Sequence, residues 1–166
     1  AVLAADPSLE MLKIGKGKLS KSGAWAVVSV VGACTEFLPL RTGSVSGAVV
    51  AFGIRNFTDR AASLEELYRV LRPGARLVIL DLSLPKRGLR SWPARFYVKK
   101  LVPFLGGVLS GRQAYEYLPR SMENFPGPSE FKMELASKGF DVVVLRSFMY
   151  GVCHMFVCTP SQKGEA

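Results

Sequence analysis

Histidine and cysteine are scarce in this sequence, which has one histidine, His154, and three cysteines, Cys34, Cys153 and Cys158. Their spacing is not that of a structural zinc site, so we predict no metal centre. An odd number of cysteines argues against a disulfide scaffold and favours a reducing compartment. We expect the thiols to be free and buried in strands, where cysteine behaves as a small apolar side chain.

Long apolar runs are also missing. No run approaches the roughly 20 residues that a membrane-spanning helix needs, and the N-terminus does not have the pattern of a signal peptide. The chain opens without methionine on the apolar residues Val2–Ala5. That opening is typical of the middle of a fold, and we expect further sequence upstream of it.

Acidic residues are absent from Leu82 to Tyr115, although basic and aromatic residues alternate there. Such a mixture favours peripheral contact with an anionic membrane. The alternatives are binding of single-stranded nucleic acid and a surface that is merely exposed to solvent. No RNA-binding motif or helix-turn-helix accompanies the segment, so we predict no nucleic-acid partner. The residues expected at the membrane are Lys86, Arg87, Arg90, Trp92, Arg95, Lys99 and Lys100.

Apolar runs alternate with helical periodicity along the rest of the chain. The runs predict buried parallel strands at residues 2–5, 26–31, 48–52 and 76–82. Helices are expected from Asp6 or Pro7 onward, over 59–71 with a cap at Asp59 or Ser63, and over 128–138 before Gly139. Strands at 140–148 and 152–159 should form an antiparallel pair with a turn at Tyr150–Gly151.

This order predicts an α/β fold with a mostly parallel sheet and a C-terminal antiparallel strand pair. Residues 1–160 form a single domain, with an irregular basic and aromatic segment at about 84–127, and residues 161–166 form a polar tail. Parallel sheets bind ligands at the carboxyl ends of their strands, so the residues that follow each strand are the candidates for a site.

Three strands end in informative residues. Asp6 can accept two hydrogen bonds from ribose hydroxyls, or can simply cap a helix. Thr35 lies in a short loop whose backbone could touch an adenine edge. Gly53 permits close approach of a ligand to the backbone. Packing does not readily explain the polar pair Arg55 and Asn56, although Arg55 could pin a loop carbonyl.

The motif Phe52-Gly53-Ile54-Arg55-Asn56 and the segment Leu67–Gly74 resemble the ubiquinone/menaquinone biosynthesis C-methyltransferase family. Segments 102–107 and 115–121 are similar to it as well, and the resemblance runs from residue 1 to about 158. It implies a Rossmann-like, class I methyltransferase fold that uses S-adenosylmethionine. The implied reaction moves a methyl group to a ring carbon of a polyprenylated quinol.

The resemblance also implies roles for particular residues. The cofactor-binding positions are Asp6, Cys34, Thr35, Ala51 and Gly53. Arg55 and Asn56 fall on the substrate side, where Arg55 would stabilise a developing phenolate or orient a water. Tyr115 and Tyr117 would lie on a lid over the quinol and serve as hydrogen-bond partners or proton relays.

The sequence departs from the family pattern on the cofactor side. The first strand and its glycine-rich loop do not precede Asp6, Cys34 replaces an Asp or Asn, and Ala51 replaces a Ser. One hypothesis is that the chain is the C-terminal part of an active enzyme. The other is a non-catalytic homologue that acts as a scaffold or lipid-quinol binder in a quinone-biosynthesis complex.

The location that the resemblance implies depends on the organism. In a eukaryote we expect the matrix side of the mitochondrial inner membrane, and in a bacterium the cytoplasm or the membrane periphery. We expect the chain to form a homodimer or to belong to a biosynthetic complex.

Overall fold

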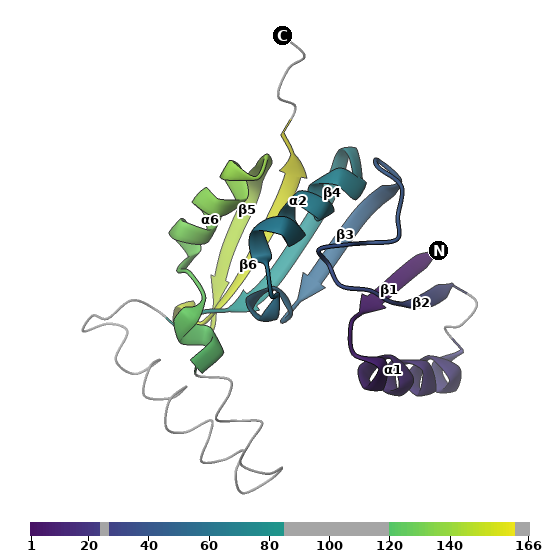
Figure 1. Cartoon of the computed structure of the whole chain (residues 1–166). Coiled ribbons are helices and arrows are strands. Elements are labelled where there is room, and N and C mark those ends of the chain that lie inside the picture. The colour runs from purple at the N-terminus through teal and green to yellow at the C-terminus, as the bar shows by residue number, and fades with distance from the viewer. Residues whose placement is uncertain (24–26, 85–119, 162–166) are drawn as a thin grey trace, which may run out of the picture.

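A computed structural model describes residues 1–23, 27–84 and 120–161 (Figure 1). The predicted lid residues Tyr115 and Tyr117, and the seven residues expected at the membrane, lie outside this part of the chain. Within it, no helix is both long and apolar enough to cross a membrane.

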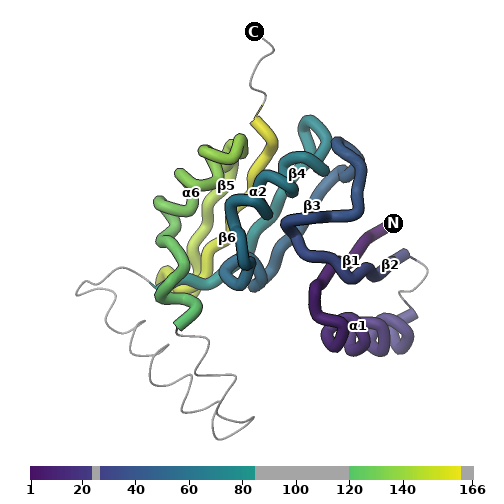
Figure 2. The backbone as a smooth tube through the Cα atoms, in the orientation of Figure 1, coloured from purple at the N-terminus to yellow at the C-terminus, as the bar shows by residue number. Residues whose placement is uncertain are grey.

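The first three elements form a small βαβ unit. Strand β1 (Val2–Asp6) pairs in parallel with β2 (Val28–Gly32), and helix α1 (Leu9–Ser22) connects them. This two-stranded sheet is separate from the other strands (Figures 1 and 2).

The other described strands form a four-stranded sheet in the order β3-β4-β6-β5. Strand β3 (Val45–Ala51) runs parallel to β4 (Leu71–Leu82), whereas β6 (Cys153–Pro160) is antiparallel to both β4 and β5 (Phe140–Phe148). The predicted C-terminal antiparallel pair is therefore confirmed, and β6 makes the sheet mixed. The predicted turn is also confirmed as the short 3-10 helix η5 (Met149–Gly151).

Helix α2 (Arg60–Val70) and helix α6 (Pro128–Ser137) follow the predicted signals closely. Asp59 caps α2 by accepting a hydrogen bond from the Ala62 amide at 2.9 Å. Gly139 ends α6 at φ 84°, where an added Cβ would meet the Tyr68 ring at 2.9 Å. The cap at Asp59 and the helix end at Gly139 both depend on nearby residues, which explains why the sequence indicates them.

Two boundaries differ from the prediction. Helix α1 is capped by Ser8, because the Asp6 carboxylate accepts from the Ser8 amide and the Ser8 hydroxyl accepts from Met11. Helix α2 stops at Val70, and β4 begins at Leu71 rather than at residue 76, because Leu71 already pairs with Val45.

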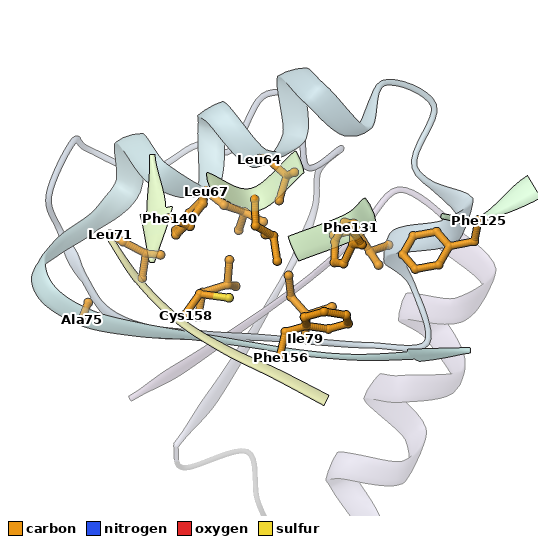
Figure 3. Packing of buried hydrophobic residues seen from close by; sticks show 13 residues of the cluster. Leu64, Leu67, Leu71, Ala75, Ile79, Phe125, Phe131, Phe140, Phe156 and Cys158 are labelled. Carbon is orange, nitrogen blue, oxygen red and sulfur yellow. The ribbon is translucent and has the colours of Figure 1, made fainter. Parts of the chain in front are cut away.

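The hydrophobic core lies between the four-stranded sheet and helices α2 and α6 (Figure 3). Phe131 of α6 is fully buried at its centre, with ring centroids 5.0 Å from both Phe125 and Phe156. Leucines 64 and 67 of α2 and Ile79 of β4 complete the same cluster.

The expectation of buried strands is confirmed for β4 but wrong for β1, β2 and β3, none of which has a buried residue. Val2 is 58% exposed and Val49 is 73% exposed, and α1 has no buried residue. The sheet is interrupted between β1 and β3. An apolar run therefore indicates a strand but does not establish that both of its faces are covered.

Replacing Phe131 by Ala should lower the free energy of unfolding by about 3–5 kcal/mol, because the cavity lies where two other rings meet. Urea denaturation would measure the change. Met133→Ala on the same helix is a matched control, since Met133 is 65% exposed and should cost less than about 0.5 kcal/mol. Equal losses in the two variants would contradict the placement of the core.

Candidate functional site

A cavity of about 530 Å³ opens where β1, β2 and β3 end. Its size is in the range of small-molecule and cofactor sites. The loop after β2 and the segment around the 3-10 helix η2 (Ile54–Asn56) complete it. The lining residues are Asp6, Pro7, Met11, Cys34, Thr35, Glu36, Ala51, Phe52, Gly53, Asn56, Phe57 and Thr58.

All five positions predicted to bind a cofactor line this cavity, and so does Asn56. They come from three strand ends that are far apart in sequence, which is the arrangement expected of a parallel sheet. The sequence reasoning missed the apolar contributors Met11 and Phe57. Met11 follows Asp6 by about one helical turn, and Phe57 directly follows the Arg-Asn pair, but neither signal distinguishes a cavity wall from a core position.

Asp6 has a local structural role and spare capacity for a ligand. One carboxylate oxygen accepts from the Ser8 amide at 2.8 Å. In the described part of the chain no hydrogen bond is formed by the other oxygen. The helix-cap interpretation is therefore wrong, because Ser8 is the N-cap of α1. The ribose-binding role of Asp6 stays a prediction, for which the second oxygen offers acceptor sites.

Neither the backbone conformation nor the space around residue 53 requires a glycine there. Its φ of −112° is open to any residue. A Cβ there would meet nothing closer than Val50 at 3.6 Å. The chain itself therefore gives no steric reason for a glycine here, and Gly53 lines the cavity.

Helix α2 holds the loop after β2 in place. Arg69 donates to the carbonyls of Leu38 and Leu40, and Glu66 accepts from the Leu38 amide at 2.8 Å. The hydrogen bond from Arg69 lowers the pKa of the Glu66 carboxyl, so this anchor stays charged at neutral pH. Glu36 also accepts from the Asp59 amide at the start of α2.

Arg55 does not line the cavity. Its Nη1 lies 2.5 Å from Oδ1 of Asp81 and donates to the Phe52 carbonyl at 2.9 Å. The Arg55 amide donates to Oδ2 of the same aspartate. These contacts match the structural interpretation, in which Arg55 pins a loop carbonyl. A direct catalytic role for Arg55 stays a prediction.

The loop that Arg55 holds is strained. Phe52 has a positive φ of 57°, which is unusual for a bulky residue. Its amide donates to the Leu80 carbonyl, while its own carbonyl is bonded by Arg55. The ion pair therefore fixes the turn from which Gly53 and Asn56 reach the cavity. Nothing local in the sequence indicates that Asp81 is the partner of Arg55, because the two residues are 26 positions apart.

A row of polar side chains continues from Asp81 across the sheet. His154 lies opposite Asp81 on β6, and Ser147 lies opposite His154 on β5. The Ser147 hydroxyl is 2.9 Å from Nδ1 of His154. Nε2 of His154 is buried and has no hydrogen bond, and burial lowers the pKa of this imidazole.

The cysteines divide into two kinds. Cys153 and Cys158 are buried as predicted. Burial raises the pKa of both thiols, to about 12 for Cys158, so they are inert at neutral pH. The prediction of burial is wrong for Cys34, which is exposed because it lies in the loop after β2 rather than in the strand. Among the described residues no group of three or more His, Cys, Asp or Glu side chains could hold a metal.

Asp81→Asn should lower the free energy of unfolding by about 3–5 kcal/mol, because it leaves the nearly buried guanidinium without its charge partner. Adding Arg55→Met should recover part of this loss, since the uncompensated charge is then removed. Chemical denaturation of the single and double variants gives the coupling energy. Additive losses would show that the pair does not act as a unit.

His154 should make the fold weaker in mild acid. Its folded-state pKa lies below the unfolded value, so the unfolded chain binds the extra proton first. Stability is then full above the unfolded pKa and falls as pH drops below about 6.5, by at most about 1.4 kcal/mol per pH unit.

Denaturation curves between pH 7.5 and 5.5 would test this expectation, with His154→Asn as the comparison. His154 is the only histidine, so the variant should show a flatter profile over this range. An unchanged profile in the variant would assign the acid sensitivity to other groups.

Comparison with known proteins identifies similar methyltransferases. The model of the ubiE/COQ5 methyltransferase family matches residues 1–159. A protein of Geotalea uraniireducens named ubiquinone/menaquinone biosynthesis C-methyltransferase UbiE is 40% identical over 140 residues, which cover 84% of this chain and 60% of that one. A Thermus thermophilus protein named demethylmenaquinone methyltransferase is 42% identical over 142 residues, 85% of this chain and 64% of that one. The chain thus spans less than two thirds of the length of these relatives.

Solved structures share the fold at lower identity. A SAM-dependent methyltransferase from Aquifex aeolicus aligns with a TM-score of 0.68 and 21% identity, covering 96% of this chain and 68% of that one. The [4+2]-cyclase SpnF aligns with a TM-score of 0.70 and 10% identity, covering 96% and 65%. These likenesses show the Rossmann-like fold of class I methyltransferases. Together with the family match over almost its whole length, they establish that the chain belongs to the ubiE/COQ5 methyltransferase family.

Proposed function

We propose that the protein takes part in S-adenosylmethionine-dependent C-methylation of a polyprenylated quinol in ubiquinone or menaquinone biosynthesis. The observation that carries the proposal is the single cavity in which Asp6, the Cys34–Thr35 loop and the Gly53–Asn56 turn meet. Membership of the family and the names of its relatives support the reaction type.

The cavity residues fit the nucleoside end of the cofactor. The unengaged carboxylate oxygen of Asp6 suits ribose hydroxyls, and we propose that the backbone of Cys34 and Thr35, which line the same cavity, contacts an adenine edge. The side chains of Cys34 and Ala51 add no oxygen acceptor. No glycine-rich loop is among the described residues that line the cavity, so these residues provide less for the methionine end.

The cofactor, when bound, supplies an already activated methyl group. The protein's own residues then have to align the reactants and exclude water. Met11 and Phe57 give the cavity apolar walls, while Asn56 offers a polar group at the turn. Arg55 is paired with Asp81, so we propose that it acts by holding that turn in place.

The remaining parts of the proposal concern the substrate side. We propose Tyr115 and Tyr117 as partners of the quinol hydroxyls, and the basic segment at 84–127 as a contact with anionic lipid. A location at the membrane periphery would follow from that contact. Assembly as a homodimer or within a quinone-biosynthesis complex belongs to the same proposal.

A non-catalytic role as a scaffold or quinol binder is the second candidate. It is favoured by Cys34 and Ala51, which line the cavity without the oxygen acceptors of the family pattern. Binding of the cofactor separates the two candidates directly, because a scaffold has no need to retain it.

Asp6→Asn should weaken binding of S-adenosylmethionine about tenfold or more, since one oxygen still serves the Ser8 amide while the other becomes a donor that ribose hydroxyls match poorly. Isothermal titration calorimetry would measure the dissociation constants. Glu10→Gln, on the exposed surface of α1, should change nothing. Failure of the unaltered chain to bind the cofactor would favour the scaffold.

A further inference from the structure

We propose that the tip of the β5–β6 hairpin, formed by Phe148, Met149 and Tyr150, inserts into the headgroup region of an anionic lipid bilayer beside the candidate site. The inference rests on the proposed function, because it explains how a site for a lipid-tailed substrate reaches the membrane. It concerns residues other than those of the basic segment at 84–127.

The tip exposes three large apolar side chains in succession. Phe148 is 44% exposed, Met149 is 59% exposed and Tyr150 is 97% exposed. A hairpin turn in water usually carries Gly, Asn, Asp, Ser or Pro. Three consecutive exposed apolar residues at a turn are instead typical of a surface that meets a partner or a membrane.

The backbone holds these side chains outward. Met149 and Tyr150 both have positive φ values, 51° and 55°, and Gly151 follows at 81°. The Val152 amide closes the turn by donating to the carbonyls of Phe148 and Met149 at 3.2 Å. Bulky residues in this conformation cost stability in water, and insertion into an apolar phase would offset that cost.

Strand register places the tip on the same rim as the cavity. Phe148 pairs with Cys153, and Cys153 pairs with Leu82 at the end of β4. Since β3 and β5 both run in the direction of β4, all three strands end at one edge (Figure 1). Ala51, at the end of β3, lines the cavity, so a bilayer that receives the tip also faces the candidate site.

Charge favours a lipid surface of negative sign. From residue 142 to residue 160 the sequence has no Asp or Glu, and Arg146 lies exposed two residues before the tip. The whole chain has a net charge of +9. Cationic charge beside aromatic and aliphatic side chains is the combination that binds anionic interfaces.

Co-sedimentation with vesicles of phosphatidylglycerol and phosphatidylcholine would test the proposal. Replacing Phe148, Met149 and Tyr150 together by Ser should lower the partition coefficient about tenfold or more, because the apolar area available for insertion is lost. Met133→Ser is the control, since Met133 of α6 is 65% exposed, close to the 59% of Met149, and vesicle binding of this variant should be unchanged. Thermal unfolding would confirm that both variants fold.

Two outcomes would overturn the proposal. The first is equal vesicle binding by the triple variant and the unaltered chain. The second is a dimer in sedimentation equilibrium that the triple variant loses while vesicles bind neither protein, which would make a second copy the partner of the tip.

A depth measurement gives an independent readout. Tyr150→Trp should add a fluorescence component that shifts to shorter wavelength on vesicles and is quenched by brominated lipid. A component that stays at the emission of water-exposed tryptophan would contradict insertion. Calorimetry without vesicles separates this inference from the proposed function, because the tip variants should bind S-adenosylmethionine as the unaltered chain does.

Discussion

The ion pair between Arg55 and Asp81 fixes the geometry on which the candidate site depends. Asp81 is 1% exposed at the end of β4, and it receives hydrogen bonds from both the guanidinium and the backbone amide of Arg55. Arg55 in turn holds the carbonyl of Phe52 in a turn that a bulky residue adopts only under constraint. Removing one partner of a buried charge pair is strongly destabilising, because the other charge then stays in the interior without compensation. The turn and the sheet edge are therefore constrained together.

The two halves of the chain are stabilised to different degrees. Strands β3 to β6 with α2 and α6 enclose a core in which Phe131 packs edge-on against Phe156 and at a tilt against Phe125. The β1-α1-β2 unit has no buried helix residue and exposes apolar side chains. The cavity lies between the halves, and the bonds from Arg69 and Glu66 anchor its middle loop to the better packed side. A ligand that bridges both walls would stabilise the unit by mass action.

Fold and chemistry are separate questions in this molecule. The same Rossmann-like fold is found in a SAM-dependent methyltransferase and in a [4+2]-cyclase, so the fold alone does not specify methyl transfer. The proposal for this chain depends on side chains at the strand ends. Asp6 and the Gly53–Asn56 turn favour the family reaction, whereas Cys34 and Ala51 remove acceptors from the same cavity.

The sequence by itself determined the order of helices and strands and some of the residues at their ends. The cap at Asp59, the stop at Gly139 and the runs that became β4 and β6 depend on neighbours a few positions away, so periodicity and turn chemistry are sufficient to find them. Because parallel strands end at one edge, the sequence also placed Asp6, Cys34 and Gly53 at a common site.

Only the tertiary structure decided which groups meet across the sheet and which remain in water. The partner of Arg55 lies 26 positions away in sequence, and the row from Asp81 to His154 and Ser147 exists through strand register alone. Exposure of Val49 and of the Tyr150 tip follows from which faces and turns other elements cover. Such facts depend on long-range pairing, which local sequence patterns do not encode.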